Sequence, residues 1–363
     1  MTLKSKKLEE QVAKRSKYSD GVGYKGAKLS SVKKVFMIGL IPKVQENYEN
    51  VKKILTTIDL SGLPISFSCD IKLDLYLVGK QNASCAHPCI YCSGASPWTN
   101  KNSGHLLTIG DLKKFHSDYM KSERKAKDAQ EANNCVNENI LQFLFPDDML
   151  LLDILNIQEL HIMMGIVWKL LEYIKSLFGK NVEDKERGAA FIHQFLVSLN
   201  ITLKRPTGLE GNQAEKVAQN SAKLTILADE LPQELSEKVK AVAPVLEAFN
   251  RVKHSCFGER IQGDYVTDIA QFSKLFRSLP KISIPPKVHL VEEHVVQFLA
   301  RRQADGFTDH GLAFWDSKPL NPLIMTSNST GREENLARIT RTMWRLSEML
   351  SWSGIALTSS LLS

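Results

Sequence analysis

Two cysteines in the segment CAHPCIYC carry the clearest chemical signal in the sequence. Cys89 and Cys92 are separated by two residues, and two thiolates at that spacing can bind one tetrahedral zinc ion at about 2.3 Å each. Pro88 and the short spacing favour a turn. Cys85 and His87 are rival ligands in the same segment, and the alternative to a metal site is a loop with free thiols.

Two histidines much later in the chain offer nitrogen ligands. His289 and His294 lie in HLVEEH, within Lys287–Ala300, whose apolar spacing predicts a helix. On a straight α-helix, residues five apart lie roughly 140° apart around the axis, so the two rings would point in different directions. A helix end or a bulge between them would bring both imidazoles onto one ion. Otherwise one histidine is a surface residue and the other a core residue.

The segments before the cysteines predict strands and helices that position a carboxylate. Val35–Leu40 (VFMIGL) is apolar enough for a buried strand, and Ile65–Cys69 (ISFSC) is a second short strand that ends at Asp70. Helical spacing predicts a helix over Glu46–Ile58. Ile71–Val78 fits either a strand or a helix, and we favour a helix. We expect Asp70 to end a central strand beside Val35–Leu40 in a parallel sheet.

Helical patterns dominate the sequence after the cysteine-rich loop. The predicted helices are Leu155–Phe178, Ala189–Leu203, Gln213–Leu227, Gln233–Asn250 and Tyr265–Leu279. The element order is therefore strand, helix, strand, cysteine-rich loop, long helical block and histidine-bearing helix. This order favours an α/β layer interrupted by a helical insertion over two independent domains.

Composition sets the limits on function. The chain has 363 residues, of which 43% are hydrophobic, so it can bury a sizeable core. The 47 basic and 40 acidic residues give a net charge of +7, which suits a polyanionic partner but is modest. No apolar run approaches the roughly 18 residues of a membrane span, and the N-terminus lacks the apolar stretch of a signal peptide. We expect a cytosolic or nuclear chain whose six cysteines are free thiols or metal ligands rather than disulfides.

Three spacings in this order resemble the RNase H-like catalytic core of the RAG recombinase and the Transib transposases. In that family the second catalytic aspartate lies eighteen residues before a CxxC pair, which shares a zinc ion with a later H-x4-H pair. Asp70, with eighteen intervening residues before Cys89, and the spacing of His289 and His294 match this pattern. The resemblance implies that Cys89, Cys92, His289 and His294 bind one structural zinc ion and that Asp70 is a catalytic residue.

Two further segments add to the resemblance. Leu209–Lys216 (LEGNQAEK) is similar to a GN-containing stretch in the helical insertion of that family. Glu159, Leu160 and His161, with Gly165 four residues later, resemble its ALHxxxG segment. The match could also reflect a related transposon lineage, or a generic DDE transposase with a different zinc arrangement.

The resemblance implies an α/β fold with a partial RNase H-like core, a large α-helical insertion and a Cys2His2 zinc clasp. The expected parts are a flexible basic arm (1–33), the partial core with its CxxC pair (34–110), the helical insertion (111–280), a zinc-binding histidine helix that returns to the core (281–315) and an aberrant tail (316–363). The family further implies DNA as a partner, a nuclear location and a homodimer, with no membrane association.

The remaining carboxylates of a DDE site are not found in the sequence. This chemistry uses two divalent ions, Mg²⁺ or Mn²⁺, held by three carboxylates. The first aspartate is expected well upstream of Asp70, before the sequence begins. Near the expected glutamate stands Asn321, and no glutamate follows until Glu333. A shifted reading frame of Asp316–Gly331 permits QQAFESVDHDFKQHW, which resembles the family's segment, so we infer a frameshift near Trp315.

The sequence thus predicts an inactive remnant of a DNA transposase that retains zinc and DNA binding, with Asp70 as its only surviving catalytic residue. Two alternatives stay open. One is a zinc-stabilised helical interaction protein with no nucleic-acid role. The other is an active DDE subunit whose missing carboxylates come from elsewhere.

Overall fold

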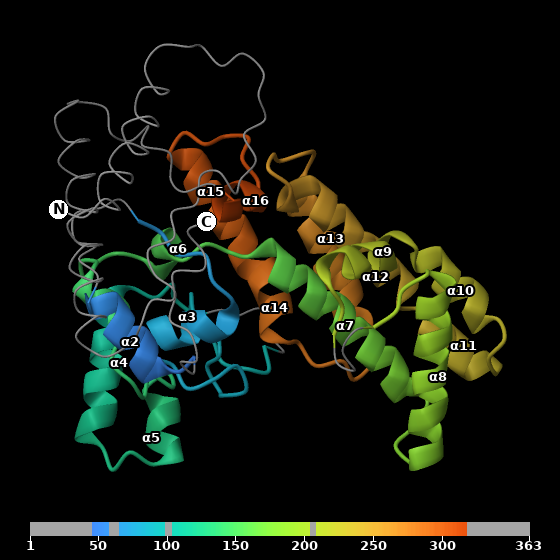
Figure 1. The fold of residues 1–363 in the computed structure, drawn as a ribbon, viewed down its shortest axis with the longest axis horizontal. Coiled ribbons are helices and arrows are strands. Elements are labelled where there is room, and N and C mark those ends of the chain that lie inside the picture. The colour runs from blue at the N-terminus through green and yellow to red at the C-terminus, as the bar shows by residue number, and fades with distance from the viewer. Residues whose placement is uncertain (1–45, 58–64, 99–103, 204–207, 318–363) are drawn as a thin grey trace, which may run out of the picture. The chain divides into compact units, whose positions relative to one another are not determined.

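Helices form nearly all of the regular structure in the residues that the computed structural model describes, namely 46–57, 65–98, 104–203 and 208–317 (Figure 1). The elements are α2 (Tyr48–Thr57), α3 (Ile71–Leu77), α4 (Ile109–Lys121), α5 (Ala126–Glu131), the 3-10 turn η2 (Ile140–Phe143), α6 (Leu151–Ile154), α7 (Glu159–Leu177), α8 (Val182–Ser198), α9 (Gly211–Gln219), α10 (Ser221–Ala228), α11 (Gln233–Lys240), α12 (Ala243–Val252), the π-helical turn η3 (Lys253–Phe257), α13 (Tyr265–Ser278), α14 (Pro286–His289), the π-helical turn η4 (Leu290–His294), α15 (Val295–Ala304) and α16 (Leu312–Ser317). These helices belong to one compact unit.

The α/β class expected from the sequence is not what these residues show. Within the described ranges, β-structure is limited to isolated bridges, so there is no RNase H-like sheet in this part of the chain. Phe67 makes a single parallel bridge to Leu155, and Asp70 then starts a helix, which leaves the extended segment too short to form a strand. The predicted strand Val35–Leu40 lies outside the described residues.

Helix α3 shows why the segment after Asp70 is helical rather than extended. Asp70 takes an extended backbone conformation (φ −66°, ψ 161°), and its side chain accepts a hydrogen bond from the amide of Leu73 at 2.8 Å. This is an N-cap, which satisfies one of the free amides at the start of a helix. The helix preferred for Ile71–Val78 is therefore confirmed, and Asp70 begins it.

The segment predicted to be helical is helical in the structure, but two of its predicted helices are each divided into two shorter ones. The single helix expected over Gln213–Leu227 is divided at Asn220 into α9 and α10. The helix expected over Gln233–Asn250 is divided into α11 and α12, because Pro244 lies in the first turn of α12. Proline has no amide hydrogen to donate within a helix, so it is tolerated at a first turn and not in the interior.

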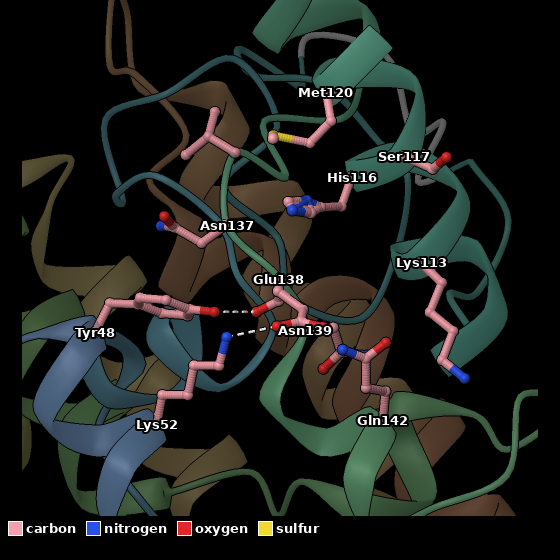
Figure 2. A pocket seen from close by; sticks show the side chains of 11 residues that line it. Tyr48, Lys52, Lys113, His116, Ser117, Met120, Asn137, Glu138, Asn139 and Gln142 are labelled. Atoms are coloured by element: carbon pink, nitrogen blue, oxygen red, sulfur yellow. Dashed lines mark hydrogen bonds and ion pairs between the residues drawn. The ribbon is translucent and has the colours of Figure 1, made fainter.

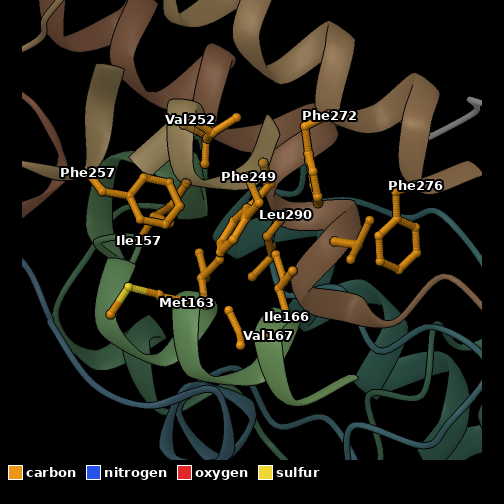
Figure 3. Packing of buried hydrophobic residues seen from close by; sticks show 14 of the residues in the cluster. Ile157, Met163, Ile166, Val167, Phe249, Val252, Phe257, Phe272, Phe276 and Leu290 are labelled. Carbon is orange, nitrogen blue, oxygen red and sulfur yellow. The ribbon is translucent and has the colours of Figure 1, made fainter. Parts of the chain in front are cut away.

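The long helix α7 is the centre of the hydrophobic core. It packs against α8, α9, α11 and α14, and α12 packs along α13. Figure 3 shows side chains from these helices meeting in one cluster, which includes Met163, Ile166, Val167, Phe249, Val252, Phe272, Phe276 and Leu290. None of the helices in the described ranges is long and apolar enough to cross a membrane.

Candidate metal centre

The cysteine pair lies on the loop between α3 and α4, which is fixed by local backbone pairing. The amide of Leu107 donates to the carbonyl of Tyr91 at 2.9 Å, and the amide of Ser93 donates to the carbonyl of His105 at 3.0 Å. Cys92 itself forms an antiparallel bridge with the returning segment. These contacts fix the backbone that carries the second thiol.

A fully buried lysine holds the other side of the loop. Lys80 is 0% exposed, and its Nζ donates to the carbonyl oxygens of His87 at 2.9 Å and Cys89 at 2.6 Å. It also donates to Oδ1 of Asn133 at 2.6 Å. A buried ammonium is tolerated only when it is hydrogen-bonded, so these bonds tie α3 to the cysteine loop.

The histidine pair lies on a distorted helix. On a straight α-helix, two residues five positions apart would point in different directions. Between α14 and α15 the backbone forms the π-helical turn η4, in which the amide of Val295 donates to the carbonyl of Leu290. Hydrogen bonds in a π-helix run from residue i to residue i+5, so residues five apart lie on the same side. His289 and His294 therefore present their Nε2 atoms to each other at 3.2 Å. Of the two arrangements that would bring both rings onto one ion, a helix end or a bulge, the structure has the bulge.

The four side chains meet at one point. Cys89 Sγ lies 3.3 Å from His294 Nε2, and Cys92 Sγ lies 3.3 Å from His289 Nε2. The four ligand atoms all lie within 4.8 Å of one another, and all four residues are buried. Tetrahedral zinc with bonds of about 2.0–2.3 Å separates its ligand atoms by about 3.3–3.8 Å. The donor set and its dimensions therefore fit a tetrahedral ion.

Neighbouring groups orient the ligands. Nδ1 of His294 is 2.8 Å from Oε1 of Gln297, an outer contact of the kind that fixes the tautomer of a metal-binding histidine. The ring of His289 stacks on Trp98, with centroids 4.3 Å apart and an interplanar angle of 6°. The amide of Tyr91 donates to Sγ of Cys89 at 3.4 Å, which favours the thiolate.

An ion pair links the histidine helix to the cysteine loop. Arg277 on α13 pairs with Glu292 at 2.6 Å, and it also donates to the carbonyl of Trp98 at 2.9 Å. The Glu292 side chain is only 1% exposed, so this contact lies inside the protein. The two halves of the cluster are thus held together by protein contacts as well as by the ligands themselves.

The pKa values of the two thiols are shifted in opposite directions. Burial alone would raise the pKa of Cys89, but its hydrogen bond with Cys92 and the neighbouring histidines lower that pKa well below its ordinary value. The pKa of Cys92 is raised, first by the hydrogen bond to Cys89 and then by burial. The surroundings therefore favour the thiolate at Cys89, and the thiolate is the form of cysteine that binds metal.

Asp70 and the rival ligands lie outside this cluster. Asp70 caps α3, and Nδ1 of His87 is 3.1 Å from the carbonyl of Ser93. Cys85 is a partly buried free thiol. Across the described ranges, the Cys2His2 group is the only set of three or more His, Cys, Asp and Glu residues that could hold one metal ion. Asn321 and Glu333 lie outside the residues that the structure describes.

A second carboxylate near Asp70 was not anticipated from the sequence. Asp74 is only 3% exposed, and it accepts a hydrogen bond from the thiol of Cys69 at 2.9 Å. Burial raises the pKa of Asp74 to about 8, the Cys69 hydrogen bond lowers it in part, and the charge of Asp70 raises it further. The second carboxylate of the helix is therefore largely protonated at neutral pH.

Four other contributors were also missed by sequence reasoning: Lys80, Asn133, Trp98 and Gln297. Lysine is usually exposed, so nothing in the local sequence marks Lys80 as buried. Gln297 follows His294 by three residues, so the two share a helix face, and this spacing was the one available signal.

Comparison with known proteins identifies no family. No protein-family profile and no curated protein matches the chain. The likeness to the RAG and Transib recombinases therefore rests on residue spacings and short segments of the sequence, whereas the geometry of the Cys2His2 cluster stands independently of it.

Proposed function

We propose that this protein is a zinc-stabilised helical module derived from a DNA transposase, and that it binds DNA without cleaving it. The observation that supports this best is the buried Cys2His2 cluster, which joins a loop near the start of the described chain to a helix near its end. The spacing of its ligands is the spacing that suggested the transposase resemblance.

The donor set favours zinc in a structural role. Two thiolates and two imidazoles suit zinc, and four protein ligands close the coordination shell, as in structural sites. The bound ion would supply a fixed tetrahedral cross-link. Cys89 and Cys92 would hold it from the loop, and His289 and His294 would hold it from η4. Lys80 and Gln297 would position these ligands from outside the shell.

The proposal of DNA binding without cleavage has separate support. Two-metal strand transfer needs several carboxylates around the ions, whereas Asp70 is engaged as a helix cap and Asp74 is mostly protonated. The net charge of +7 suits a polyanion. A nuclear location, a homodimeric state and binding of Mg²⁺ or Mn²⁺ follow only from the resemblance and stay predictions.

Three measurements on the purified full chain test the proposal. Elemental analysis should find zinc in an equimolar ratio to protein, and anisotropy of labelled DNA should show binding that weakens steeply with salt. A nicking assay with Mg²⁺ or Mn²⁺ should show no cleavage. A protein that folds without zinc would contradict the clasp. Nicking that disappears in Asp70→Ala would show that the chain is an active subunit.

A zinc-stabilised interaction protein with no nucleic-acid role is the second candidate. It is favoured by the helical character of the described residues, which show no sheet of the RNase H type. Zinc without any DNA binding in the same measurements would support it.

A further inference from the structure

A groove beside Asp70 combines aromatic rings with lysines. It lies between α3, the middle of α7 and the start of α14, and it has a volume of about 710 Å³. Its apolar lining includes Tyr76 and Trp168, both partly buried against the core. Lys72, Lys169 and Lys287 also line it. The groove is outside the Cys2His2 cluster, and neither the zinc clasp nor the capping of α3 uses it.

Lys287 is the least satisfied charge in the groove. It is partly buried, and no hydrogen bond or ion pair reaches its ammonium from the described residues; the charge of Asp70 acts on it from nearby. The side chain lies directly over Gly165, where an added Cβ would sit 2.2 Å from Lys287 Cδ and 2.5 Å from Nζ. The absence of a side chain at Gly165 is what lets this ammonium lie along α7.

The other charges leave the groove positive. Lys169 donates only to the hydroxyl of Ser283, at 2.9 Å. Lys72 makes a loose, solvent-exposed pair with Glu46 at 3.6 Å, and its Nζ lies 5.7 Å from the centroid of the Tyr76 ring. Glu172 is the one acidic residue among those that line the groove in the described structure, so three lysines face one carboxylate.

This combination differs from a second hollow of the described structure. A pocket of about 490 Å³ lies between α2, α4 and η2, and Figure 2 shows its polar side chains. There Lys52 pairs with Glu138 at 2.5 Å, and Lys113 pairs with Asp147. Its cations are neutralised by the protein itself, whereas Lys287 and Lys169 form no ion pair with an acid among the residues that the structure describes.

We propose that the groove between α3 and α7 binds a single strand of nucleic acid. Unpaired bases would stack on Trp168 and Tyr76, because every base has a π-face, and the lysines would contact the phosphates. A base pair inside a duplex has both faces covered by its neighbours, so these rings select for an unpaired strand. This inference rests on the proposed DNA-binding function and names its site and the form of its ligand.

The experiment measures anisotropy of a fluorescein-labelled oligothymidylate of about 15 nucleotides, a length that covers the site of a typical single-strand binder. The zinc-loaded full chain is compared with Trp168→Leu and Lys287→Met over a range of salt concentrations. Phe143→Leu changes an aromatic residue that does not line the groove and is half-exposed, and Lys274→Met removes an exposed lysine on α13. These two variants control for ring size and for net charge.

We expect Trp168→Leu to weaken binding of the oligothymidylate by about tenfold, because one base would lose the aromatic ring on which it stacks. Lys287→Met should also flatten the dependence of log K on log salt by about 0.7, the value for one phosphate contact on a single strand. The control variants Phe143→Leu and Lys274→Met should change neither the affinity nor the salt dependence. A duplex of the same length should bind more weakly and be insensitive to Trp168→Leu.

Each other result overturns the inference in a distinguishable way. Wild-type affinity in both groove variants would place the strand elsewhere and leave the proposed DNA-binding function intact. No binding of strand or duplex by the wild-type chain would remove both. Displacement of the strand by polyglutamate, with no effect of Trp168→Leu, would show that the groove takes acidic peptides instead.

Discussion

The Cys2His2 cluster and the Asp70–Asp74 pair are both sets of ionisable groups in the described chain, yet they are built in opposite ways. The cluster takes its ligands from two segments far apart in sequence, and their four ligand atoms converge within 4.8 Å. The two aspartates lie at the start of a single short helix, and each is satisfied locally. Asp70 accepts a backbone hydrogen bond, and Asp74 accepts one from Cys69.

This difference separates burial from metal binding. Asp74 is as buried as the cysteines, but it avoids the cost of a buried charge by holding a proton. In the cluster, by contrast, the neighbouring groups lower the pKa of Cys89 although that thiol is buried. A divalent ion would satisfy all four groups at once. Convergence of donors, rather than their burial, identifies the metal site.

The largest effect is expected from loss of a zinc ligand. Cys92→Ser should abolish stoichiometric zinc and most of the folding free energy, because structural zinc contributes about 10–16 kcal/mol in small zinc domains and a whole domain is stable by only about 5–15 kcal/mol. Thermal unfolding followed by circular dichroism, with elemental analysis of the same sample, measures both. A strong chelator should reproduce the effect in the wild-type protein.

The matched control is Cys85→Ser, which changes a partly buried free thiol in the same loop. It should keep both zinc and the unfolding temperature. If Cys92→Ser behaved like Cys85→Ser, the cluster would be a set of packed side chains with no metal, and the contrast with the aspartates would disappear.

Lys80→Met tests whether the loop must be held for the cluster to form. The substitution keeps the length of the side chain but leaves the acceptors of His87, Cys89 and Asn133 without their donor. Each unsatisfied buried acceptor costs roughly 1–3 kcal/mol, so we expect a loss of about 3–5 kcal/mol in urea unfolding and weaker zinc binding. Lys274→Met, at an exposed position, should change neither. Unchanged zinc affinity in Lys80→Met would show that the ligands hold the loop by themselves.

The buried Asp74 carboxyl can be tested through the pH dependence of the folding stability. The pKa of Asp74 is about 8 in the folded protein, so between the ordinary carboxyl pKa and 8 the folded state keeps a proton that the unfolded state releases. Stability must therefore fall as pH rises through this window, although Tyr91 and Asp70 also face this group. Between about pH 5 and about pH 8 we expect a loss of about 3–4 kcal/mol.

Asp74→Asn should remove most of this slope in the unfolding temperature, because an amide does not titrate. Asp118→Asn makes the same chemical change at an exposed position on α4 and should leave the slope as it is. If the slope of the wild-type protein persisted in Asp74→Asn, Asp74 would be ionised in the folded state and available to a cation.

The sequence predicted the residues of the metal site more accurately than it predicted the fold class. Donor type and spacing singled out the two cysteines and the two histidines, because these are local properties, and the family resemblance grouped them around one ion. The long apolar helix was also predicted correctly, because its apolar spacing lies in consecutive residues. The helix after Asp70 was the favoured one of two interpretations, and the cap that starts it was seen only in the structure.

The α/β class was wrong for the described residues because strand formation depends on a partner. Ile65–Cys69 has the composition of a strand, but only Phe67 finds a backbone neighbour, in Leu155. Likewise, the burial of Lys80 depends on acceptors from Asn133, which is distant in sequence. Single-sequence patterns carry no information on such pairings, so these features could not be anticipated.

Asp70 gives the smallest effect and the sharpest distinction between a cap and a catalytic carboxylate. Asp70→Ala removes the hydrogen bond to the amide of Leu73 and should cost about 1 kcal/mol in urea unfolding, as loss of an N-cap does. Asp70→Asn keeps the capping oxygen, since asparagine caps helices as well as aspartate does, and should stay within a few tenths of a kcal/mol of the wild type. A carboxylate that holds a divalent ion would behave differently, because the amide is a neutral and weaker ligand. Asp70→Asn could keep wild-type stability but lose a Mg²⁺-dependent nicking activity or bind Mn²⁺ more weakly than the wild type does. Either result would show that Asp70 holds a metal ion in addition to capping α3. Equal behaviour of Asp70→Asn and the wild-type protein in unfolding, metal binding and nicking would leave capping as the role of this residue.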